Sequence, residues 1–159
     1  MNKSGLGGAG QVLTGLAIVI GGKNTFGFCD VKVPDWEYEV VDENSTGIPK
    51  SPKITLDVYD LGAEYISAVQ SGESIVVKGN IRTENDDVPY TATMTLQLHK
   101  IGTELKEGEK TKRTLEARVD TFEETVDGKQ TIKYNRKALE LVVGGDGVNL
   151  LEKFGSNVL

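Results

Sequence analysis

Apolar and polar residues alternate along much of the chain, which is the pattern of β-strands that bury one face. In the clearest stretch, alternate residues point to opposite sides: Tyr90, Ala92, Met94, Leu96 and Leu98 to one, and Thr91, Thr93, Thr95, Gln97 and His99 to the other. Similar patterns predict strands at residues 16–20, 25–33, 36–40, 54–58, 74–82, 114–122 and 131–143. We therefore expect a chain made mostly of strands.

Turn-forming residues separate these strands. Gly21-Gly22-Lys23-Asn24 and Asp127-Gly128 carry the signals of β-hairpins. Residues 43–52 are polar and contain one glycine and two prolines, which predicts an extended loop long enough to carry a function. In the last strand the apolar residues change parity, which predicts a bulge or kink near residues 135–138.

One helix is expected, at residues 63–71, where Tyr65, Ile66 and Val69 share a face and Gly72 follows as a stop signal. The sequence of residues 148–154 is also compatible with one or two helical turns. Short strands divided by turns predict a mainly β fold, a sandwich or an incomplete barrel with one short flanking helix.

The length of 159 residues favours a single domain. We place this domain at residues 16–159, after a glycine-rich arm at residues 1–15. Within the arm, residues 5–10 read Gly-Leu-Gly-Gly-Ala-Gly and match the dinucleotide-binding pattern. That pattern needs a strand before it and a helix after it, but only four residues precede it and a β-branched stretch follows. The glycines are better explained as an arm that allows close backbone contact with a neighbouring subunit.

Charge and composition narrow the function further. The net charge is −6 and the pI is near 4.9, which argues against tight DNA binding because phosphate contacts need clustered lysine and arginine. A single cysteine, Cys29, and a single histidine, His99, provide neither a disulfide framework nor a metal site. No nucleophile, base and orienting group occur in a recognisable pattern. We expect no enzyme activity, no catalytic residues, no metal and no cofactor.

Several features follow one another in a characteristic order. They are a hairpin at residues 21–23, Val31-Lys32-Val33-Pro34, the polar loop at 43–52, the helix at 63–71, a charged loop within 99–112, a hairpin at 127–129 and the closing stretch ALELVVGGDGVNLLEKFGSNVL at 138–159. In this order the chain, from residue 16 to residue 159, resembles the major tail tube proteins of contractile-tailed bacteriophages, which are related to the tubes of phage-like bacteriocins. It departs from that family in a longer glycine-rich arm and a shorter helix.

The resemblance implies an architecture and a set of partners. Six subunits would form a ring whose sheets close into one inner β-barrel, and rings would stack into a hollow tube inside a contractile sheath. The partners would be further copies of the chain, the sheath protein, baseplate and tail-terminator proteins, the tape measure protein and, transiently, DNA. The protein would be assembled in the cytoplasm of the bacterial host and would reside in the virion tail. No membrane partner is expected.

The resemblance also suggests which residues make contacts. Contacts between subunits and rings are expected from the arm, the polar loop and the chain end: Gly5, Leu6, Gly10, Asn44, Ile48, Pro49, Lys50 and Leu159. Residues expected to line the channel are Thr93, Thr95, Gln97 and Glu116. Six subunits of charge −6 would give about −36 per ring, and a channel of like charge would repel DNA phosphates. Alternatively, these charges serve only solubility.

Three other functions remain open. The chain could form the tube of a type VI-like secretion system or of an extracellular injection device, which would carry protein effectors, and neighbouring genes would distinguish this case. A small-molecule-binding β-barrel would be a monomer with a closed apolar pocket. An enzyme would have an activity that depends on His99.

Overall fold

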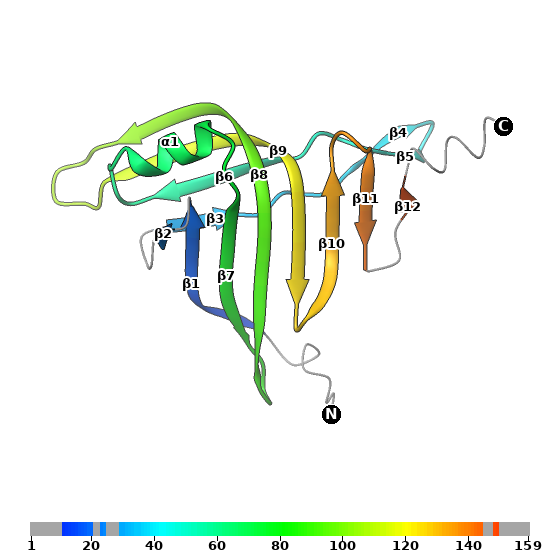
Figure 1. The fold of residues 1–159 in the computed structure, drawn as a ribbon, viewed down its shortest axis with the longest axis horizontal. Helices are drawn as coiled ribbons and strands as arrows, with labels where there is room; N and C mark the ends of the chain where they lie inside the picture. The colour runs from blue at the N-terminus through cyan, green and yellow to red at the C-terminus, as the bar shows by residue number, and fades with distance from the viewer. Residues whose placement is uncertain (1–10, 21–22, 25–28, 145–147, 150–159) are drawn as a thin grey trace.

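The computed structural model describes residues 11–20, 23–24, 29–144 and 148–149 (Figure 1). The described part contains one short helix and a series of antiparallel strands, which confirms the mainly β fold. The elements are β1 (Val12–Ile20), β2 (Lys23–Asn24), β3 (Cys29–Lys32), β4 (Tyr38–Val41), β5 (Asn44–Pro49), β6 (Lys53–Val58), α1 (Glu64–Gln70), β7 (Ile75–Arg82), β8 (Asp87–Glu104), β9 (Lys112–Val126), β10 (Lys129–Asn135), β11 (Glu140–Val143) and β12 (Val148–Asn149).

One sheet contains ten of these strands and folds over to make two layers. Its main path runs β12-β11-β10-β9-β8-β7-β1-β2, and β6 pairs with the first part of β9 and with β3. We call β1, β7, residues 87–95 of β8, residues 121–126 of β9, β10 and β11 the long layer. The cross layer consists of β3, β6, residues 112–119 of β9 and residues 96–104 of β8. Figure 1 shows β3 and β6 running across the direction of the long-layer strands.

The bend between the layers lies where the β8–β9 ladder is irregular. The register shifts between Thr95 and Leu96 and again between Leu98 and Lys100. Such bulges bend and twist a strand pair. Because β8 and β9 both continue through the bend, the same two strands supply the centre of the long layer and the edge of the cross layer.

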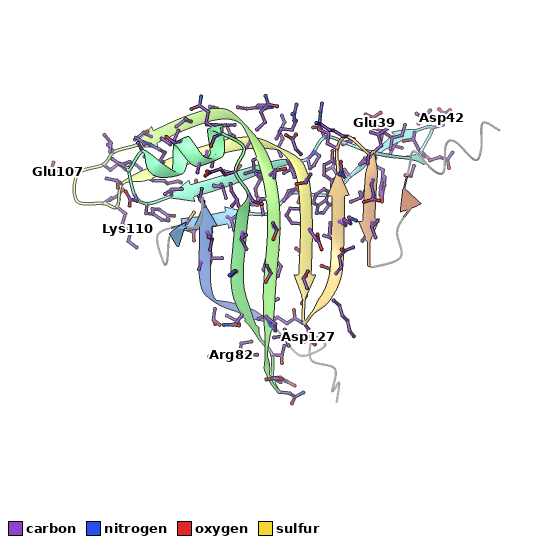
Figure 2. All side chains as sticks on the ribbon, viewed as in Figure 1. Glu39, Asp42, Arg82, Glu107, Lys110 and Asp127 are labelled. Atoms are coloured by element: carbon purple, nitrogen blue, oxygen red, sulfur yellow. The ribbon has the colours of Figure 1, made fainter. Side chains whose placement is uncertain are left out.

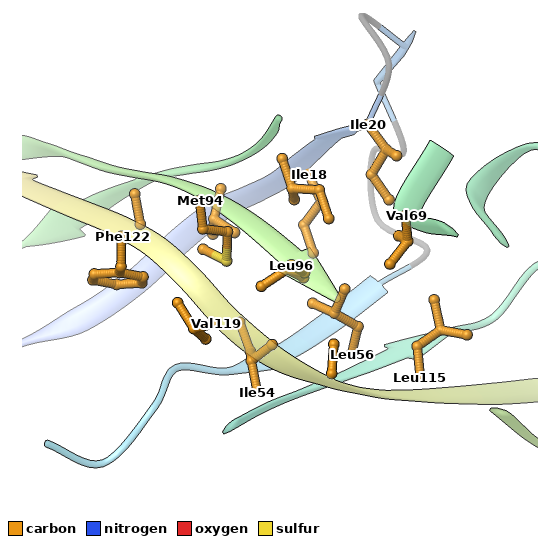
Figure 3. Close-up of a cluster of buried hydrophobic side chains, with 14 of the residues drawn as sticks. Ile18, Ile20, Ile54, Leu56, Val69, Met94, Leu96, Leu115, Val119 and Phe122 are labelled. Atoms are coloured by element: carbon orange, nitrogen blue, oxygen red, sulfur yellow. The ribbon is translucent and has the colours of Figure 1, made fainter. Parts of the chain in front are cut away.

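The hydrophobic core lies between the layers (Figure 3). Ile18, Met94 and Phe122 enter it from the long layer, and Leu56 and Leu115 enter it from the cross layer; all five are almost completely buried. Full burial of an aliphatic or aromatic side chain of this size contributes about 1.5–3 kcal/mol. The expected alternation in β8 is confirmed, because Ala92, Met94 and Leu96 are the buried members of that strand's first half.

The helix α1 covers one end of this core, as expected from its sequence. Ala68 and Val69 are its buried residues. The Ser71 hydroxyl donates to the Ser67 carbonyl over 2.8 Å, and Gly72 follows with a φ of 76°, a conformation that glycine adopts without strain. These contacts end the helix one residue earlier than expected.

The final strand of the sequence prediction is wrong, since residues 131–143 form a hairpin rather than one kinked strand. β10 and β11 pair antiparallel, with Tyr134 opposite Leu141. The Asn135 side-chain oxygen accepts a hydrogen bond from the Ala138 N–H over 3.1 Å, and Leu139 adopts a φ of 50°. The change in parity between the two apolar stretches therefore comes from a chain reversal.

The polar loop expected at residues 43–52 is also wrong, because it contains β5. This strand pairs with β4 in a separate two-stranded sheet. Asp42 and Glu43 both have positive φ, 52° and 66°, which is the geometry of a two-residue type I′ turn. The Thr46 hydroxyl donates to the Glu39 carbonyl over 2.9 Å and helps to hold the two strands together. We call this unit, residues 38–49, the β4–β5 hairpin.

Other boundaries differ in smaller ways. β1 begins at Val12, four residues before the expected start, because Gly15 (φ 63°) lies within a strand irregularity and not in a loop. The strand expected at 25–33 is represented by β3, which pairs with β6 and not with β1; residues 25–28 lie outside the described residues. Val148 and Asn149 form the strand β12, so they are not helical, and residues 150–154 are not described.

Candidate assembly surfaces

The outer face of the long layer is rich in threonine. In β8 and β9 the side chains that alternate with the buried ones are Thr91, Thr93, Thr95, Thr121, Glu123 and Thr125. Thr95 and Thr121 lie opposite each other, and their hydroxyl oxygens are 2.7 Å apart. Cross-strand threonine pairs of this kind stabilise a sheet and leave a polar surface. We call this surface the threonine face.

Acidic and basic side chains balance on this face. By the register of the strands, its described charged residues are Lys78, Arg82, Lys133, Asp87, Glu123 and Glu140, three of each sign. Arg82 forms an ion pair with Asp87 at 3.4 Å, and Lys133 with Glu140 at 3.5 Å. The net charge of −6 is therefore not concentrated on this part of the described surface.

The residues predicted for the channel do not all lie on the threonine face. Thr93 and Thr95 lie at its centre. Gln97 is exposed at the bend, opposite Arg118. Glu116 lies beyond the bend, in the cross layer, where its carboxylate pairs with Lys100 at 3.7 Å. The structure thus brings together two of the four predicted residues.

Four residues predicted to make subunit contacts lie on or next to the β4–β5 hairpin. Asn44, Ile48 and Pro49 belong to β5, and Lys50 follows it and pairs with Glu37 at 3.4 Å. Gly5, Leu6, Gly10 and Leu159, the other predicted contact residues, lie outside the described residues.

The β4–β5 hairpin combines exposed apolar and acidic side chains. Val40 and Val41 retain 60% and 61% of their accessible surface. Figure 2 shows Glu39 and Asp42 on this hairpin at one end of the molecule, while Glu107 and Lys110 lie at the opposite end, on the β8–β9 connection. Adjacent exposed valines on a projecting hairpin are typical of a surface that a partner covers.

The long layer has an edge strand on each side. β1 pairs with β7 along its length, but on its other side it pairs only at Val19 and Ile20, with β2. β11 pairs with β12 only at Glu140 and Leu141. Among the described residues, the outer edges of Val12–Ala17 and of Val142–Val143 have no strand partner. Exposed edges of this kind are templates for pairing with another chain.

A family model described as phage tail tube protein FII matches residues 10–158. The chain belongs to this family. It is therefore a structural subunit of a tail tube, which agrees with the resemblance seen in the sequence. The structure is also similar to that of Hcp1 from Flavobacterium johnsoniae, with a TM-score of 0.54 and 14% sequence identity over 73% of this chain and 97% of that one. A comparison with curated proteins finds no match.

The described residues of this tail tube protein contain no group of three or more potential metal ligands. His99 is exposed on β8, and Cys29 is buried beneath the cross layer. Burial, with the nearby charges of Asp30 and Asp57, raises the pKa of the Cys29 thiol to about 12, so the thiol stays protonated near neutral pH. Within the described part of the chain, no helix has the length and apolar character needed to cross a membrane.

Proposed function

We propose that six copies of this chain form a ring, and that the rings stack into the conduit of a contractile tail through which DNA passes during ejection. The observation that carries the proposal is the pair of unpaired edges on opposite sides of the long layer. A contact between two different edges of identical chains repeats around a ring when the rotation closes.

The two edges are suited to each other. Along the sheet every neighbouring pair is antiparallel, from β1 through β7, β8, β9 and β10 to β11. It follows that β11 runs opposite to β1, so β11 of one copy placed against β1 of the next continues the antiparallel pattern. Closure of the sheets into one barrel would remove every exposed edge of the long layer.

In this arrangement the threonine face lines the channel. Hydroxyl groups and paired charges present few free cations to DNA phosphates, and phosphate affinity depends on unpaired lysine and arginine. Thr93 and Thr95 would face the channel near its middle. Low adhesion would then come from neutrality on this face and not from a strongly acidic lining.

The β4–β5 hairpin would contact a neighbouring subunit or the next ring. Burial of Val40, Val41 and Ile48 would supply the apolar part of that contact. We assign the same role to the arm residues Gly5, Leu6 and Gly10 and to Leu159. The outside of the tube would meet the sheath, and its ends would meet baseplate and terminator proteins, with the tape measure protein inside. Assembly would take place in the bacterial cytoplasm before incorporation into the virion tail.

A tube of a type VI-like secretion or extracellular injection device is the second candidate, because such a tube would use the same ring. The genes beside this one distinguish the two: capsid and terminase genes for a phage, secretion components for the alternative. For the ring itself, the test is negative-stain electron microscopy of the purified chain together with its mass from light scattering. Rings or tubes of uniform width with a six-fold mass are expected, and a monomer at every concentration would contradict the proposal.

A further inference from the structure

The core between the two layers is open at the end opposite α1. There the long layer extends beyond β3 (Figure 1). The space has a volume of about 350 Å³, and its lining is mostly apolar: Leu13, Leu16, Val31, Val33, Val77, Ile81 and Tyr90, with Gln11 and Glu124. We call it the apolar groove. Leu13, on its rim, retains 49% of its accessible surface.

A single carboxylate lies in the wall of this groove. The Tyr90 hydroxyl donates to Oε2 of Glu124 over 2.6 Å, and the Thr131 hydroxyl donates to Oε1 over 2.7 Å. Each oxygen of the carboxylate is thus held in place by one hydroxyl. No basic side chain belongs to the groove lining. A ligand suited to this groove is therefore a mostly apolar segment that carries one cation.

Residues 150–159, which follow β12, have this composition. Their sequence is LEKFGSNVL preceded by Leu150, so it supplies five large apolar side chains and one lysine, Lys153. Residues 1–10 fit less well, because apart from Met1 they supply only Leu6 as a large apolar side chain among four glycines. Lys153 would supply the cation for Glu124.

The position of the groove favours the segment from another copy. Within one chain, β12 lies five strand positions from β7, about 24 Å at the usual spacing between strands. The direct route across the core face is blocked, because Trp36 covers Phe122 and Tyr134 with ring centroids 5.1 and 5.3 Å away. When the β11–β12 edge lies against β1 of the next copy, the distance to that copy's β7 falls to about two strand positions, roughly 10 Å.

We propose that the apolar groove of each subunit binds residues 150–159 of the adjacent subunit, with Lys153 paired to Glu124. This inference rests on the ring proposed above, since it requires the two edges to be neighbours. The segment would seal the open end of the core and join the copies on the core side of the sheet, in addition to the strand pairing at the edge.

The test uses crosslinking between two full-length variants with different affinity tags, mixed before assembly. One carries Leu13→Cys in the groove and the other carries Leu151→Cys. A short bismaleimide is added to the assembled fraction. The native Cys29 is buried and remains unreactive. The matched control replaces Leu13→Cys with Leu105→Cys, an even more exposed leucine in the distant β8–β9 connection. Proximity raises the effective concentration, so we expect at least about ten-fold more mixed dimer than in the control.

The outcomes separate the two proposals. Tubes without the expected mixed dimer, or tubes in which Leu6→Cys and not Leu151→Cys reacts with Leu13→Cys, would overturn the groove proposal and leave the ring intact. Failure of the unmodified chain to form rings or tubes would overturn both. For the ion pair, Lys153→Glu should raise the concentration needed for assembly about ten-fold, whereas Lys153→Arg should not. Equal assembly by both variants would exclude the pairing with Glu124.

Discussion

The hydroxyl of Tyr90 on β8 lies 2.6 Å from Oε2 of Glu124 on β9, and this hydrogen bond joins the centre of the long layer at the wall of the apolar groove. Tyr90→Phe removes the donor and keeps the ring. Hydrogen bonds to charged groups contribute more than neutral ones, but the site is partly open to water, so we expect a loss of about 1 kcal/mol in the free energy of unfolding. Urea denaturation measures it, with Tyr59→Phe, whose hydroxyl is exposed, as the control.

Burial of Cys29 predicts a loss of stability at alkaline pH. The pKa of this thiol is raised from 9.0 to about 12, so the unfolded chain loses the proton at a lower pH than the folded chain. Stability from this group is complete below about pH 9 and declines between pH 9 and 12, by about 1.4 kcal/mol per pH unit. Raised pKa values of Tyr90 and Tyr134 add to the decline above pH 10.

Denaturant titrations at pH 8 and pH 10 measure this effect. The difference between the two pH values should be smaller in Cys29→Ala than in the unmodified chain. Equal differences in both proteins would show that the thiol does not contribute. The Ala variant itself should be less stable at both pH values, because Cys29 packs in the core.

Gly128 tests the hairpin between β9 and β10. Asp127 and Gly128 have φ angles of 53° and 75°, the type I′ turn that the sequence predicted. A Cβ at Gly128 would meet no atom within 4 Å, so Gly128→Ala changes only the backbone strain and should cost about 1 kcal/mol. Gly102→Ala is the matched control, since its Cβ would also meet nothing but its φ is not positive. A cost equal to that of the control would contradict the turn geometry.

Val143 tests the closure of the ring. The Gly144 N–H donates to the Thr131 carbonyl over 2.7 Å, and N–H groups alternate in direction along a strand, so the Val143 N–H points away from β10. Val143→Pro removes this donor from the outer edge without removing a donor to β10. We expect folded subunits that no longer form rings by electron microscopy and light scattering. Val143→Thr keeps the N–H and should assemble; assembly by both variants would exclude this edge from the interface.

Trp36 tests how the core is closed beneath β9 and β10. Its ring packs against those of Phe122 and Tyr134. Loss of these contacts in Trp36→Ala should cost about 3 kcal/mol. Trp36→Phe keeps an aromatic ring and should cost less than half as much. Both values come from denaturant unfolding at neutral pH.

The strands with regular alternation could be predicted from the sequence, and those that depend on unusual turns could not. β8 was identified with the correct buried face, because each apolar residue from Ala92 to Leu96 contacts the core. The β10–β11 hairpin was missed because Asn135–Leu139 contains neither glycine nor proline and reaches positive φ at a leucine. The β4–β5 turn was missed for the same reason, since Asp42-Glu43 lacks the usual glycine.

The surfaces were predicted only as far as they follow from alternation. Thr93 and Thr95 were correctly placed on a polar face, whereas Glu116 was grouped with them because register shifts near residues 95–100 leave no mark in the sequence. The apolar groove could not be predicted, because Leu13, Val31, Ile81 and Glu124 come from four strands and meet only through the bend of the sheet. The edges required the full strand order.

The passage of β8 and β9 through both layers has a mechanical consequence. A pull on the cross layer reaches the long layer along two continuous backbones and not only through side-chain contacts. The layers therefore cannot slide past each other without disrupting the ladder that joins these strands. A subunit built in this way resists shear as one body, so a load applied to the outside of a tube wall would be borne by the same strands that line its channel.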